Sequence, residues 1–111
     1  MDIKSFIQSF LHALSDIDFI DGVELHSEAF IIKGRVSMKK GRFLQIYLNE
    51  KTGTIAFALI EAERRIWGVD SNNMSGWHMH PVEKPEEHID CQPMSAETLV
   101  EQIKKAWGQI P

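Results

Sequence analysis

The sequence has one cysteine, Cys91, four prolines and one tyrosine, and it has no long apolar run. A single cysteine excludes an internal disulfide and a zinc site built from several thiolates. A membrane helix needs about 20 consecutive apolar residues, so we expect no membrane-spanning segment. The start, MDIKSFIQSF, mixes polar with apolar residues and lacks the small-residue cleavage site of a signal peptide. A cytoplasmic location is therefore the expectation.

The length and the distribution of charge suggest one domain with a basic middle. A chain of 111 residues can bury one hydrophobic core but not two, so we expect a single domain over residues 1–111. The net charge is -4, which argues against generic nucleic-acid binding, yet residues 33–65 contain eight Lys or Arg against three Asp or Glu. This basic segment could face a phosphate backbone while the acidic remainder repels it.

Apolar residues predict a helix at each end of the chain. Between residues 3 and 14 they recur every three or four positions, with Asp2 as the N-cap. Near the other end, Ser95 is a good N-cap for a helix whose apolar face is formed by Leu99, Val100, Ile103, Ala106, Trp107 and Ile110.

The middle of the chain predicts strands. Alternating apolar and polar residues indicate strands over 30–38, 43–48, 54–60 and 65–69, with a further strand over 19–25 as an option. Their short connections favour an antiparallel meander. The fold class expected is therefore α+β, an antiparallel four- or five-stranded sheet with the N-terminal and C-terminal helices packed on one face. Residues 71–76 are expected to be loop-like, and the histidine segment that follows, up to residue 91, is expected to be extended and irregular.

The segment GWHMHPVEKPEEHIDC, residues 76–91, contains three of the five histidines. Side chains two residues apart in an extended segment point the same way, so His78 can pair with His80, and His88 with Asp90. If the chain between the pairs folds back, these four residues form a ligand set for a divalent metal such as zinc.

Proton transfer is the alternative chemistry for the same histidines. Cleavage of RNA by its own 2'-hydroxyl needs a base, an acid and a cation beside the phosphate. Any two of His78, His80 and His88 could provide the base and the acid. The other candidates lie on the polar faces of the predicted strands, where they would bind the phosphate or the rest of the substrate: Lys33, Arg35, Arg65 and Tyr47.

Several of these motifs together resemble the TumE-like family of prokaryotic toxin proteins. They are Ile31-Ile32-Lys33-Gly34-Arg35-Val36, Gly41 to Tyr47, Arg65-Ile66-Trp67-Gly68-Val69-Asp70, His78-Met79-His80-Pro81 and Pro85 to Asp90. In that family an aromatic-rich strand ends in an aspartate, which corresponds to Asp70, and a His-Pro element and a proline-led histidine cluster follow. The chain differs in its longer link from Asp70 to His80.

This resemblance implies a small α/β protein that is encoded beside an antitoxin, its cognate partner, and is directed at RNA or translation. It adds Asp70 to the candidate catalytic residues His78, His80, His88 and Arg35. A ribonuclease-like toxin that requires no cofactor is the leading hypothesis. A metal-dependent hydrolase using the His/Asp set and a non-catalytic module whose basic sheet binds an acidic partner are the alternatives, and a homodimer is compatible with each.

Overall fold

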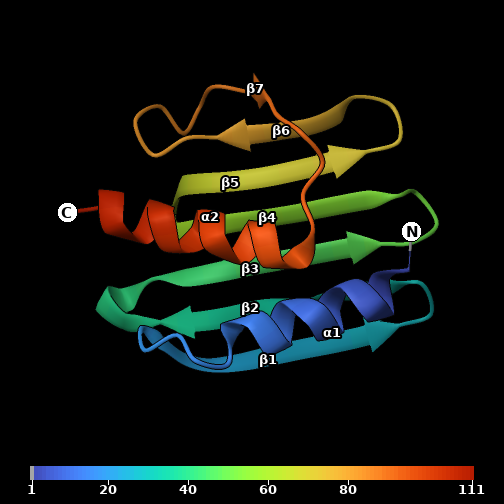
Figure 1. The fold of residues 1–111 in the computed structure, drawn as a ribbon, viewed down its shortest axis with the longest axis horizontal. Coiled ribbons are helices and arrows are strands. Elements are labelled where there is room, and N and C mark those ends of the chain that lie inside the picture. The colour runs from blue at the N-terminus through green and yellow to red at the C-terminus, as the bar shows by residue number, and fades with distance from the viewer. Residues whose placement is uncertain (1) are drawn as a thin grey trace.

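The computed structural model describes residues 2–111, in which two α-helices lie side by side on one face of a sheet (Figure 1). The elements in chain order are α1 (Ile3–Leu14), β1 (Ile20–Glu28), β2 (Ile31–Met38), the 3-10 turn η1 (Lys39–Gly41), β3 (Phe43–Asn49), β4 (Thr54–Glu61), β5 (Arg64–Asn72), β6 (Gly76–His80), β7 (Ile89–Asp90) and α2 (Ala96–Gln109).

Both predicted helix starts are confirmed by their capping geometry. The N–H groups of Lys4 and Ser5 donate to Asp2 Oδ1 at 3.0 and 3.2 Å. The hydrogen bonds from Ser5 are the main reason why the pKa of the Asp2 carboxyl is lowered. At α2, the Thr98 N–H donates to Ser95 Oγ at 3.1 Å. Each cap satisfies N–H groups that the first turn of a helix leaves without a partner.

The expected number of strands is wrong. The sheet has seven strands in the order β1 to β7, and each pairs antiparallel with its neighbours in the sequence. The extra strands include β6 and β7, in the segment expected to be irregular. Asn72 Oδ1 accepts the N–H groups of Met74 and Ser75, both at 2.8 Å, and this turn returns the chain along β5.

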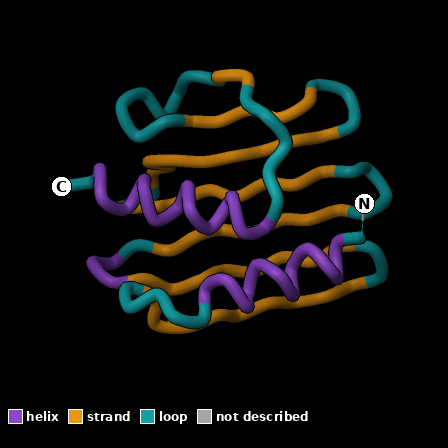
Figure 2. The backbone as a smooth tube through the Cα atoms, in the orientation of Figure 1, coloured by secondary structure: helices purple, strands orange, loops and turns teal. Residues whose placement is uncertain are grey.

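The helices cover one face of the sheet, as expected (Figures 1 and 2). Alternate side chains of the central strands point under them, and Phe57 of β4 packs against Phe10 of α1 with ring centroids 5.0 Å apart. The core on this face includes Val36, Leu44, Ile46, Leu48, Ile55, Leu59, Val69, Leu99 and Ile103. The intervening side chains point away from the helices and form the second face, called the open face below.

Neither helix in the described residues 2–111 has the length and apolar character needed to cross a membrane.

Candidate functional site

Strand register places the candidate residues in two rows across the open face. Residues directly opposite each other in antiparallel strands share a face. One row runs through His26, Lys33, Tyr47, Ala56, Asp70, His78 and Asp90. The adjacent row runs through Glu24, Arg35, Gln45, Ala58, Gly68 and His80. Residues far apart in the chain therefore meet on one surface.

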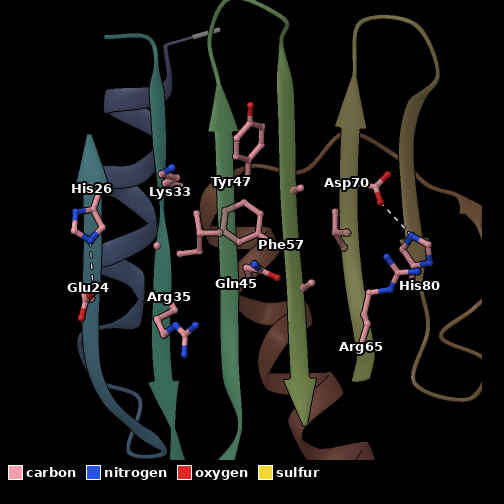
Figure 3. A pocket seen from close by; sticks show the side chains of 15 residues that line it. Glu24, His26, Lys33, Arg35, Gln45, Tyr47, Phe57, Arg65, Asp70 and His80 are labelled. Atoms are coloured by element: carbon pink, nitrogen blue, oxygen red, sulfur yellow. Dashed lines mark hydrogen bonds and ion pairs between the residues drawn. The ribbon is translucent and has the colours of Figure 1, made fainter. Parts of the chain in front are cut away.

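A cavity of about 500 Å³ lies along these rows. Figure 3 shows its basic side chains Lys33 and Arg35 on one side, with Asp70, His80 and Arg65 on the other. Tyr47 and Gln45 project between the two groups. The cavity thus has cationic groups and a histidine-carboxylate pair at both sides, with Glu24 and His26 on one side and Asp70 and His80 on the other.

A β-bulge turns Arg65 toward this cavity. Leu59 pairs with Trp67, whereas Ile60 pairs with Arg65, so β5 has one additional residue at this point. Without that residue, strict alternation would place Arg65 on the helix-covered face. The Arg65 Nη2 group instead donates to the Pro85 carbonyl at 3.5 Å, beside His80.

His80 is fixed at both ring nitrogens. Its side chain is 1% exposed, Nδ1 lies 3.0 Å from the Pro85 carbonyl oxygen, and Nε2 lies 3.1 Å from Asp70 Oδ2. A carbonyl can only accept, so Nδ1 must donate to it. Both hydrogen bonds then form only if the ring carries two protons or if Asp70 carries one. This arrangement makes His80 an anchor for Asp70.

His78 is more accessible and lies between two carboxylates. Its side chain is 17% exposed, Nε2 lies 3.3 Å from Asp90 Oδ1, and Nδ1 lies 3.8 Å from Asp70 Oδ1. The exposed His88 ring packs edge-on against His80 and His78, with centroids 4.3 and 5.8 Å apart. The structure therefore brings together the three rings that the spacing predicted would meet.

This group of side chains, His78, His80, His88, Asp70 and Asp90, is called the histidine cluster below. Residues 2–111 contain no group of three or more His, Cys, Asp or Glu side chains arranged to hold a metal ion. In the conformation described, both nitrogens of His80 already have partners. The zinc site using His78, His80, His88 and Asp90 stays a prediction.

The basic segment divides into structural and accessible residues. Arg42 is buried, donates from Nε to Glu61 at 2.6 Å and stacks on the Trp107 ring at 4.8 Å, so it belongs to the core. Arg35 is exposed on the open face and lies over the Phe43 ring at 4.2 Å. Within residues 2–111, neither Arg35 nor Lys33 has an ion-pair partner. These two cations remain available to a ligand.

Sequence reasoning missed the middle of the cavity. Gln45, Ala56, Ala58 and Gly68 line it or lie in its rows, and Pro85 supplies the carbonyl that fixes His80. The alternation of β4 held a signal, because Ala56 and Ala58 alternate with buried Ile55, Phe57 and Leu59. The role of Pro85 had no such signal, because it depends on how a loop folds.

No family model, curated protein or solved structure matches this chain. The resemblance to the TumE-like family accordingly stays a prediction. The fold and site define an α+β protein with two helices on one face of a seven-stranded antiparallel sheet and a histidine cluster on the other.

Proposed function

We propose that this protein is the toxin-like component of a toxin–antitoxin pair and acts on RNA in the cytoplasm as a ribonuclease. The observation that supports this most is the histidine cluster at one side of a cavity lined by Lys33, Arg35 and Arg65. Proton-transfer groups beside cations are what cleavage of a phosphodiester requires.

The reaction proposed is attack by the RNA 2'-hydroxyl on the adjacent phosphorus. His78 removes the hydroxyl proton, the 2'-oxygen bonds to phosphorus, and the bond to the 5'-oxygen breaks. His88 donates a proton to that leaving oxygen, giving a 2',3'-cyclic phosphate and a free 5'-hydroxyl. The two rings are neighbours, with centroids 5.8 Å apart, so both can serve one phosphate.

The other residues have supporting roles. His80 is a positioning residue, because it is buried and holds Asp70, which in turn lies beside His78 Nδ1. Arg65, next to the cluster, stabilises the charge that develops on the phosphate oxygens. Tyr47 lies two β-strands away from Asp70, and Lys33 and Arg35 lie three β-strands away. These three residues bind the rest of the RNA.

A cleavage assay tests the enzymatic part of the proposal. Purified protein is incubated with labelled single-stranded RNA in excess chelator, and products are analysed for 2',3'-cyclic ends. We expect cleavage by the wild type and a rate reduced by about 10²–10⁴-fold in His78→Ala. Intact RNA under all conditions, with or without added divalent metal, would contradict the proposal.

The same assay tests a second candidate, a metal-dependent hydrolase, for which His78 would be the central ligand because it neighbours both His88 and Asp90. Activity that disappears in chelator and returns with zinc, together with stoichiometric zinc lost in His78→Ala, would replace the first mechanism with this one.

The toxin part rests on the resemblance and is tested separately. Induced expression should arrest bacterial growth, and co-expression of the adjacent reading frame should restore it through a stable complex. Growth arrest that His78→Ala does not relieve would separate toxicity from the histidine cluster.

A further inference from the structure

Small side chains line the middle of the cavity, and larger polar side chains line its two edges. Tyr47 and Gln45 on β3 are separated from Asp70 and Arg65 on β5 by Ala56 and Ala58 on β4. Because adjacent strands lie about 4.8 Å apart, the groups on β3 and β5 face each other across about 10 Å. The space between them is as broad as a planar heterocycle, and its floor is two methyl groups.

Gly68 allows close packing at one end of this floor. A side-chain carbon at this position would lie 3.0 Å from the Phe57 carbonyl oxygen, 3.2 Å from Arg65 Cδ and 3.6 Å from His80 Cδ2. Any side chain would therefore crowd Arg65 and the backbone of β4. Glycine lets Arg65 lie close to β5 beside the histidine cluster.

The edges of the cavity carry polar groups that can still donate or accept hydrogen bonds. Within residues 2–111, the Gln45 amide makes no hydrogen bond with another side chain or the backbone, and Gln45 is exposed. It presents a donor and an acceptor side by side. Tyr47, on the same strand as Gln45, is 37% exposed. Across the floor, Arg65 provides donors and Asp70 an acceptor.

An apolar floor with donors and acceptors at its edges matches the chemistry of a nucleobase, whose faces stack on apolar or aromatic groups and whose edge carries hydrogen-bonding atoms. The cavity volume of about 500 Å³ falls in the range of small-ligand pockets. A phosphate alone would need only the cations and would leave this floor unused.

We infer that the cavity binds one unpaired nucleobase flat on Ala56 and Ala58, with its edge contacted by Gln45. This inference rests on the proposed function, and it assigns the base to the nucleotide adjoining the phosphate at Arg65 and His78. A paired base has its hydrogen-bonding edge occupied, so the substrate class is single-stranded RNA with a base preference determined by Gln45.

The test compares nucleoside monophosphates with inorganic phosphate as ligands of the full chain. Ala58→Leu places a larger side chain on the floor, and Ser37→Leu is the matched control, because Ser37 is exposed on the open face but outside the cavity. We expect Ala58→Leu to weaken monophosphate binding at least tenfold and to leave phosphate binding unchanged. Ser37→Leu should change neither.

A second variant keeps the inference testable if Ala58→Leu folds poorly. Gln45→Ala removes an exposed amide, and we expect it to reduce the difference in affinity among the four monophosphates. Wild-type monophosphate binding by Ala58→Leu, or an unchanged preference in Gln45→Ala, would overturn the inference even if the protein cleaves RNA. Monophosphate binding that responds to both variants, in a protein that leaves RNA intact, would support the base site and refute the ribonuclease.

Discussion

Asp70 Oδ2 lies 3.1 Å from Nε2 of buried His80, on the next strand of the sheet. The same carboxylate reaches toward the more accessible His78 with its other oxygen, at 3.8 Å. One buried and one accessible histidine thus share an acid, which gives the two rings different roles. The first two predictions follow from this difference.

His80→Ala should destabilise the protein. It removes a buried ring together with its hydrogen bonds to Asp70 and the Pro85 carbonyl, and should lower the free energy of unfolding by about 2–4 kcal/mol. Urea unfolding followed by tryptophan fluorescence measures this. Unfolding midpoints that match those of the wild type would show that the two hydrogen bonds of His80 contribute nothing.

His78→Ala should affect activity far more than stability. A positioned acid or base contributes about 10²–10⁴-fold to a rate, so RNA cleavage should fall by that factor, while unfolding changes by less than about 1 kcal/mol. His12→Ala, an exposed histidine of α1, is the control and should keep full activity. Equal rates for the two variants would remove His78 from the reaction.

Arg35→Ala should weaken RNA binding more than Lys40→Ala. Arg35 lies in the cavity, whereas Lys40 lies in the turn η1 outside it. Each phosphate contact to single-stranded RNA contributes about 0.7 to the slope of log affinity against log salt, so Arg35→Ala should reduce that slope by about this amount. Fluorescence anisotropy at several salt concentrations measures it. Identical slopes for both variants would place the RNA elsewhere.

Cys91 should react slowly with thiol reagents. Its pKa is raised above the ordinary value of 9.0, first by burial and then by the negative charges of Asp70 and Asp90. The folded state therefore favours the neutral thiol, and this contribution to stability is complete below pH 9.0 and decreases as pH rises through the higher folded pKa.

Alkylation at pH 8 measures this reactivity. We expect a lower rate than for an unhindered thiol and a higher rate in Asp90→Asn, which removes one of the charges that disfavour the thiolate. A wild-type rate equal to that of free cysteine would contradict the raised pKa.

Periodicity predicted the helices and the central strands because their apolar residues repeat along a buried face. It failed for β6, where Trp77 and Met79 alternate with His78 and His80, because the prolines and polar residues around them are typical of loops. The two-residue strand β7 is too short to have any period and forms only because β6 offers it a partner.

The candidate site was predicted in part for similar reasons. The i, i+2 spacing of His78 and His80 is local, so their shared face followed from the sequence. Burial of His80 depends on the Pro85 carbonyl, and the position of Arg65 depends on a bulge, and neither is encoded in a short pattern. The residues that lie beside Ala58 likewise depend on the register of the whole sheet.

The pairing of every strand with its neighbour in the sequence also determines how the chain folds. Each step of sheet formation closes only a short loop, and the entropy lost on closure grows with loop length. We expect the strands to add in succession along the chain. The docking of α2 against α1 joins the two ends of the chain and closes a much longer loop. Mutations in that helix pair should therefore change the unfolding rate more than the folding rate.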